Sequence, residues 1–176
     1  MSPHLRTALA LALAAFLTFA LTGGGRIVGS DEVTMFALGR AMAHGGIAVP
    51  EGATRQGPDG RYYSKNTAGQ ALLALPLVVA GDVAAKAGGF TGERAQLAAR
   101  FLASFFNAIV ASFLIAALYG GLRSLRVSAR AALAAAVLVG FTTPLWIYAK
   151  SFMAEPLEAL GLLLTLVGAA HAGAAP

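Results

Sequence analysis

Residues 95–119 read AQLAARFLASFFNAIVASFLIAALY, an apolar run long enough to cross a bilayer as a helix, which needs about 20 residues. The composition of the whole chain agrees with this interpretation. Of its 176 residues 57% are hydrophobic and 12% are charged, and the mean hydropathy is +0.71, whereas about 25% of the residues of a soluble domain are charged. Alanine and leucine dominate and β-branched residues are few, which favours helices over a barrel. The sequence therefore predicts an all-α, polytopic membrane protein.

Three further segments are predicted to cross the bilayer, in addition to a helix over 95–120. The segment 1–22 has a short basic start and no clear A-x-A site after it, so an uncleaved first helix is favoured over a secretory signal. The other two are 131–149 and 156–172. The segment 69–89 (GQALLALPLVVAGDVAAKAGG) is interrupted by a proline and an aspartate, so its helix, 69–86, is expected at the membrane surface. A fifth span there is the alternative.

The distribution of charge sets the expected orientation. The loop 121–130 (GLRSLRVSAR, from residue 121) contains three arginines and no acid, so it is predicted to face the cytoplasm of a bacterial-type plasma (inner) membrane. The N-terminus then also lies in the cytoplasm. Residues 23–94 form a long extracytoplasmic loop and residues 150–155 a short one on the same side.

The remaining composition excludes several classes of function. The net charge is +5, but the arginines do not cluster with aromatic residues, so no nucleic-acid partner is expected. The chain has no cysteine, which excludes disulfides, thiolate metal sites and cysteine nucleophiles.

The segment 29–46, GSDEVTMFALGRAMAHGG, follows the first span and predicts a juxtamembrane helix over 31–44 with Ser30 as its N-cap. Helical spacing places Asp31 on the same stripe as the apolar side chains of this helix and turns Glu32 elsewhere. A carboxylate on a buried stripe is costly unless it is paired or used. Asp31 and Glu32 are therefore catalytic candidates. The alternative is that both acids only complement the positive end of the helix.

A second informative segment is VPEGATRQGPDGRYYSK, residues 49–65. Its Pro-Asp-Gly sequence predicts a tight turn. The residues after the turn, Arg61, Tyr63 and Lys65, are candidates for binding the phosphate of a lipid at headgroup depth. An interfacial aromatic belt and a snorkelling lysine are the alternatives.

The third segment is AKSFMAEPLEAL, residues 149–160. Its proline is well placed to begin a helix, and Glu155 precedes that proline. Glu155 and Glu158 are three residues apart and lie on one face of that helix, and an acid within a span is a candidate functional residue.

The order of these features resembles the GT-C superfamily of membrane glycosyltransferases. The branch most similar to it contains the protein O-mannosyltransferases and the aminoarabinose transferases of lipid A. In that branch an Asp-Glu pair opens a juxtamembrane helix after the first span, as SDEVTMFALGRAMAHGG does here. A Gly-x-Tyr-Tyr-x-Lys element then enters a second surface helix, matched by DGRYYSKNTAGQALLALP, and an acid begins a later span, matched by KSFMAEPLEAL.

The resemblance implies transfer of a sugar from a polyprenyl-phosphate-linked donor to an acceptor hydroxyl on the outer side of the membrane. It implies that Asp31 is the general base, that Glu32 assists it, and that Lys65 contacts the donor phosphate. Glu155 would correspond to the second-loop acid. No cofactor is implied, and a divalent metal is left open.

The chain also departs from the pattern of that branch. Thr34 and Met35 stand where the aminoarabinose transferases have Arg-Tyr, and Lys65-Asn66-Thr67 replaces Lys-Pro-Pro, which argues against that substrate. Members of the superfamily have many more spans, so we expect this chain to be an N-terminal portion that works with the rest of an enzyme or with another membrane subunit. The alternatives are a non-catalytic scaffold or lipid-binding subunit, and a transporter fragment.

Overall fold

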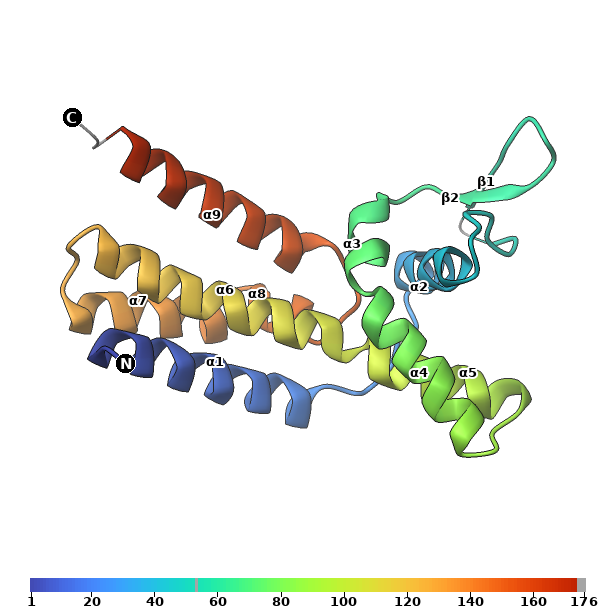
Figure 1. Cartoon of the computed structure of the whole chain (residues 1–176), viewed down its shortest axis with the longest axis horizontal. Coiled ribbons are helices and arrows are strands. Elements are labelled where there is room, and N and C mark those ends of the chain that lie inside the picture. The colour runs from blue at the N-terminus through green and yellow to red at the C-terminus, as the bar shows by residue number, and fades with distance from the viewer. Residues whose placement is uncertain (53, 174–176) are drawn as a thin grey trace. The chain divides into compact units, whose positions relative to one another are not determined.

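The computed structural model describes residues 1–52 and 54–173, and most of them are helical. The chain divides into two compact units (Figure 1). We call residues 1–22, 107–150 and 154 onward the bundle, and residues 23–106 with 151–153 the loop unit. Each unit has its own packing and is described by itself. The predicted helical class is confirmed.

The bundle is built from α1 (Pro3–Thr22), α6 (Phe105–Ser124, from residue 107), α7 (Ala129–Thr142), α8 (Leu145–Tyr148) and α9 (Glu155–Ala172). Figure 1 shows α1, α6 and α7 running alongside one another. Small side chains allow this close approach. The core consists of Phe19, Ile115 and Tyr119 packed among alanines of α1, α6 and α7. A Cβ atom on Gly140 of α7 would lie 2.5 Å from Ile115 of α6.

The outer surface of α1 is apolar rather than polar. Five of its six leucines recur at every fourth residue and are exposed: Leu5, Leu9, Leu13, Leu17 and Leu21. An exposed leucine stripe of this kind suits contact with lipid. Among the described residues, two helices are long and apolar enough to cross a membrane, Pro3–Thr22 and Gly92–Ser124. Four spans remain a prediction.

The predicted helix over 131–149 is not continuous. α7 ends at Thr142, Thr143 is extended, and α8 begins after Pro144. The residue before a proline is forced out of the α region, which explains the break. α9 begins at Glu155, so this acid lies in the first turn of the helix.

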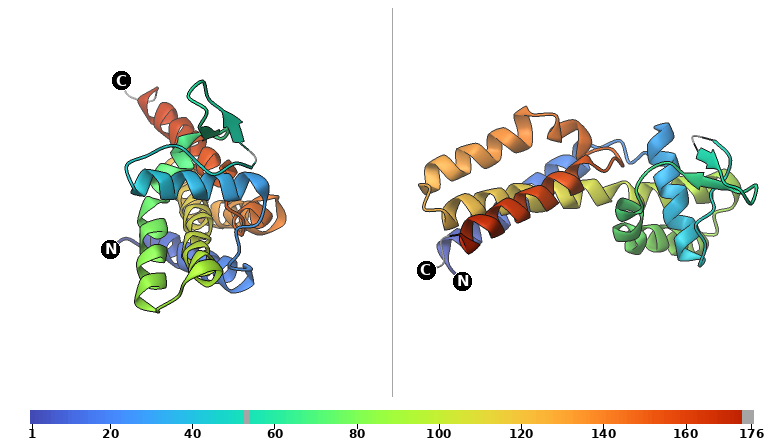
Figure 2. Two further views of the ribbon diagram at one scale, coloured as in Figure 1. Left: turned by 90° about the vertical axis from the view of Figure 1, so that its right-hand side faces the viewer. Right: turned by 90° about the horizontal axis from the view of Figure 1, so that it is seen from above.

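The loop unit contains α2 (Ser30–Ala43), α3 (Ala68–Leu73), α4 (Leu75–Ala87) and α5 (Gly92–Ala103). The single helix expected over 69–86 is therefore two helices, which meet at Ala74, and Pro76 lies in the first turn of the second. α4 packs against α5 where Gly81 meets the backbone of Ala99. α2 lies across α3 and α4 (Figure 2), with Gly39 against Ala71 and Val78.

A short antiparallel hairpin, which the sequence did not predict as strands, joins α2 to α3. β1 (Thr54–Gln56) pairs with β2 (Tyr62–Ser64) so that Arg55 lies opposite Tyr63. The predicted Pro-Asp-Gly turn connects them and ends at Gly60, whose φ of 76° is in the left-handed region that glycine adopts without strain. The hairpin brings the end of β2 back toward α2.

The contact between Gly81 and Ala99 predicts opposite effects for the same substitution at two glycines. A Cβ atom on Gly81 would lie 2.6 Å from the carbonyl oxygen of Ala99, whereas one on Gly69 would meet nothing within 4 Å. We expect Gly81→Ala to lower the free energy of unfolding by about 1–3 kcal/mol. Gly69→Ala should leave it unchanged or raise it by up to about 1 kcal/mol. Thermal unfolding in detergent measures both, and equal stability of the two variants would contradict the packing described here.

Candidate functional site

The candidate site lies at the N-terminus of α2. Gly29 is the N-cap residue, with an extended backbone at φ −63° and ψ 144°, and the helix follows from Ser30. Ser30 is therefore the first helical residue rather than the predicted N-cap. Asp31 and Glu32 both occupy the first turn, where a negative charge interacts favourably with the helix dipole.

Glu32 is buried, with 7% of its surface exposed, and its carboxylate is fully engaged by backbone donors. One oxygen, Oε2, accepts hydrogen bonds from the N–H groups of Gly29 at 2.8 Å and Val28 at 3.1 Å. The other, Oε1, accepts one from Phe152 N–H at 2.8 Å. The prediction that Glu32 points away from the buried side is therefore wrong. Its side chain turns back over the N-cap and joins the 151–153 segment to the start of α2.

Asp31 is the more accessible of the two acids, and it is paired with Lys65. The distance from Asp31 Oδ1 to Lys65 Nζ is 2.8 Å, and the two side chains are 35% and 41% exposed. Asn66 Nδ2 donates to the backbone carbonyl of Asp31 at 3.4 Å. The hydrogen bond from Lys65 lowers the pKa of Asp31 below its ordinary value. This arrangement holds Asp31 ionised and places an ammonium group beside it.

Arg61 and Tyr63, the other predicted phosphate-binding residues, belong to a different cluster. The Tyr63 hydroxyl donates to Asp59 Oδ2 at 2.7 Å, and Arg61 Nε lies 3.8 Å from the same oxygen. The hydrogen bond from the Tyr63 hydroxyl to Asp59 lowers the pKa of Asp59 and raises the pKa of Tyr63. These side chains stabilise the hairpin turn, so the structure brings Lys65 to Asp31 and engages Arg61 and Tyr63 elsewhere.

Glu155 is part of the bundle. It is the first residue of α9, and its Oε2 atom is buried with no hydrogen-bond partner among the described residues. The expected grouping of Glu155 with Asp31 remains a prediction.

Other polar groups of the loop unit were missed by sequence reasoning. Arg40 of α2 forms an ion pair with Asp82 of α4 at 3.2 Å, and Arg100 of α5 stands over the ring of Phe36, 5.9 Å from its centroid. Arg100 carried a usable signal, because a charged residue within a predicted span is a functional candidate. The pairing of Arg40 with Asp82 gave no such signal, because it depends on the packing of α2 against α4.

No family model, curated protein or solved structure matches this chain. The geometry of its own residues therefore carries the functional argument. Across residues 1–52 and 54–173, no group of three or more histidine, aspartate or glutamate side chains is arranged to hold a metal ion.

The three backbone donors around Glu32 predict a structural role that can be measured. Glu32→Gln puts an amide NH₂ group against N–H donors, and a buried unsatisfied donor costs about 1–3 kcal/mol. We expect a clear loss of thermal stability in detergent. Glu93→Gln is the matched control, because Glu93 is an exposed glutamate in the first turn of α5 and makes none of these bonds. A Glu32→Gln variant as stable as the control would show that the carboxylate is not needed to hold the start of α2.

The pairing of Asp31 with Lys65 predicts a titration shift. Removal of the ammonium group in Lys65→Met should raise the pKa of Asp31 toward its ordinary value, as followed by carboxyl ¹³C NMR. Because the folded-state pKa is lowered, the pair contributes stability above the ordinary pKa of aspartate, and this contribution is lost as the pH falls through the lowered pKa. Tyr63→Phe is the control, since it should raise the pKa of Asp59 and leave that of Asp31 unchanged. An unshifted Asp31 in Lys65→Met would contradict the pairing.

Proposed function

We propose that this chain is the membrane module of a glycosyltransferase that moves a sugar from a polyprenyl-phosphate-type donor to an acceptor hydroxyl on the extracytoplasmic side. The observation that carries the proposal is the 2.8 Å pair between Asp31 and Lys65 at the start of α2. A proton acceptor and a cation for a phosphate are the two groups that this reaction requires. The sequence resemblance assigns these two roles to the same two residues.

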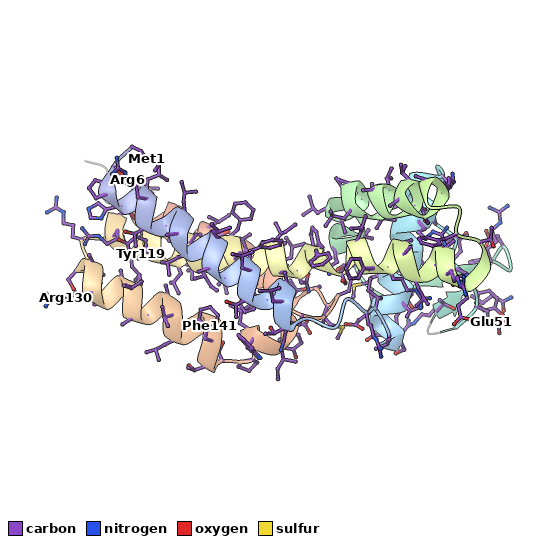
Figure 3. The ribbon with its side chains drawn as sticks, turned by 90° about the horizontal axis from the view of Figure 1, so that it is seen from below. Met1, Arg6, Glu51, Tyr119, Arg130 and Phe141 are labelled. Atoms are coloured by element: carbon purple, nitrogen blue, oxygen red, sulfur yellow. The ribbon has the colours of Figure 1, made fainter. Side chains whose placement is uncertain are left out.

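The proposed topology has four spans: α1, α6, α7 with α8, and α9. Met1, Arg6 and Arg130 lie toward one end of the bundle (Figure 3), and His4 Nε2 lies 3.2 Å from Arg123 there. Such a concentration of arginine favours the cytoplasmic side of a plasma membrane. The segments that enter and leave the loop unit then emerge on the other side.

The length of α6 supports this topology. Its 20 residues extend about 30 Å at 1.5 Å per residue, which matches the hydrocarbon core. The 33-residue run Gly92–Ser124 would extend about 50 Å and exceeds the core. We therefore place the second span at α6 rather than at the predicted 95–120, and α5 outside the bilayer.

The chemistry follows from competition for Lys65. A donor phosphate that binds the Lys65 ammonium group weakens the hold of Lys65 on Asp31, so the carboxylate becomes a stronger base. Asp31 then takes the proton of the acceptor hydroxyl as its oxygen attacks the anomeric carbon. The bond from that carbon to the phosphate oxygen breaks, and Lys65 stabilises the departing lipid phosphate. One displacement of this kind inverts the anomeric carbon.

Opposite effects of two variants on lipid-phosphate binding test the proposal. Lys65→Gln should weaken binding of a short-chain polyprenyl phosphate to the detergent-solubilised chain by about tenfold or more, since a charge-assisted contact is lost. Asp31→Asn should bind it as well as or better than the wild type, because the competing carboxylate is gone. In membranes of cells that contain the variant chain, Asp31→Asn should reduce sugar transfer by about 100-fold or more.

Lys86→Gln is the matched control, because Lys86 is an exposed lysine in the last turn of α4. It should change neither binding nor transfer. Undiminished transfer in Asp31→Asn would remove Asp31 from the mechanism, and undiminished binding in Lys65→Gln would remove Lys65. Binding that depends on Lys65 without any transfer would instead support a non-catalytic lipid-binding subunit.

A further inference from the structure

A cleft of about 700 Å³ lies within the loop unit on another face of α2. Val33, Ala37 and Ala41 line it from α2, and Arg100 lines it from α5. Asp31 is two positions before Val33, so at about 100° per residue it is directed to a different side of the helix. The cleft is therefore distinct from the pair that Asp31 forms with Lys65.

Arg100 presents an unmatched positive charge to this cleft. Its Nε atom is buried without a hydrogen-bond acceptor, and among the described residues no carboxylate lies within ion-pair distance of its guanidinium. The guanidinium stands over the ring of Phe36. A buried N–H without an acceptor costs free energy that a bound anion would recover. The guanidinium is thus poised for a ligand that supplies oxygen atoms.

Arg40 extends the cationic lining along α2. Its Nε donates to Asp82 at 3.2 Å, which uses one of the five N–H donors of a guanidinium. His44, one turn further on, is held through Nδ1, 2.8 Å from the carbonyl of Arg40. Glu51 contributes a carboxylate to the lining, and it is exposed, so water screens its charge.

The rest of the lining is apolar, and the cleft is much larger than a phosphate group needs. Val33, Ala37, Ala41, Val49 and Pro50 provide carbon surface. Binding sites for organic ligands typically enclose about 300–1,000 Å³. A ligand that fills this cleft therefore combines an anionic group with a carbon portion.

We propose that this cleft binds the phosphate group of an amphiphilic ligand through Arg100 and Arg40. Planar guanidinium groups bind phosphate through paired, charge-assisted hydrogen bonds. The same chemistry is offered by the headgroup of an anionic lipid and by a soluble phosphate ester. This site goes beyond the proposed function, because it is a second phosphate site that does not involve Lys65.

The test measures binding of inorganic phosphate by ³¹P NMR to the full chain in phosphatidylcholine nanodiscs. It is carried out in the Lys65→Gln background, so that binding at Lys65 does not contribute. Adding Arg100→Gln should weaken phosphate binding by about tenfold or more. The phosphate affinity of Arg100→Lys should lie between that of its parent and that of Arg100→Gln, because lysine keeps the charge and lacks the planar pair of donors. Glu51→Gln should change binding by much less than Arg100→Gln does, since water screens the exposed Glu51 carboxylate.

The controls separate binding from folding. Arg94→Gln removes an exposed arginine of the same helix and should bind phosphate like its parent. Arg100→Gln should unfold at about the same temperature as its parent, because removal of an unsatisfied buried donor offsets loss of the contact with the Phe36 ring. If adding phosphatidylglycerol to the nanodiscs abolishes the binding of phosphate, the occupant is a lipid headgroup. If phosphate still binds in the presence of phosphatidylglycerol, the occupant is a soluble ester. Phosphate binding that is absent, or is unchanged by Arg100→Gln, would overturn the proposal whatever becomes of Lys65.

Discussion

The start of α2 depends on a buried carboxylate that has no neighbouring cation in its contacts. Glu32 is held by three backbone N–H groups, two from the residues that lead into the helix and one from Phe152. A buried carboxylate is tolerated when hydrogen bonds replace the water that it loses. Because these bonds fix the first turn, the adjacent Asp31 is directed toward the end of β2, where Lys65 follows the hairpin. The reactive-looking pair is thus positioned by a residue that is itself fully occupied.

The sequence was sufficient to place α2 and to select Asp31 and Lys65 as candidates, because both lie in motifs of one connected segment, but it did not predict that the two side chains form an ion pair. It was not sufficient to orient Glu32. A helical wheel treats every position alike, whereas the third residue of a helix can fold its side chain back over the N-cap. The remaining partner of Glu32 is Phe152, which lies 120 positions along the chain, and no local pattern reveals such a contact. The engagement of Tyr63 with Asp59 was missed because each strand of the hairpin has three residues, too few to show a periodicity.

The breaks at Ala74 and Thr143 expose a second limit of sequence reasoning. Hydropathy measures the free energy of transferring side chains from water to an apolar phase, and it does not depend on backbone hydrogen bonding. An apolar run that contains a proline is therefore still predicted as one segment, although the proline interrupts the helix. Pro76 was recognised as an interruption, yet a single helix was expected there, and Pro144 lies inside a run predicted to be continuous. Arg100 was overlooked for a different reason: although a charged residue within a predicted span is a signal, the apolar residues around it dominated the average hydropathy.

The cations that lie beside two faces of α2, Lys65 after β2 and Arg100 on α5, are in different electrostatic states. Lys65 is matched by Asp31, so an incoming phosphate must displace a carboxylate and gains only the difference between two similar charge-assisted contacts. Arg100 is unmatched, so an anion there gains the whole interaction and also satisfies a buried donor. A matched cation therefore favours exchange, in which binding of the ligand releases a base. An unmatched cation favours retention, in which the ligand is bound and no carboxylate is released to act as a base. The difference follows from where carboxylates lie along α2 and the segments beside it. Under the two proposals, the Asp31 face is the one suited to reaction and the Arg100 face the one suited to anchoring.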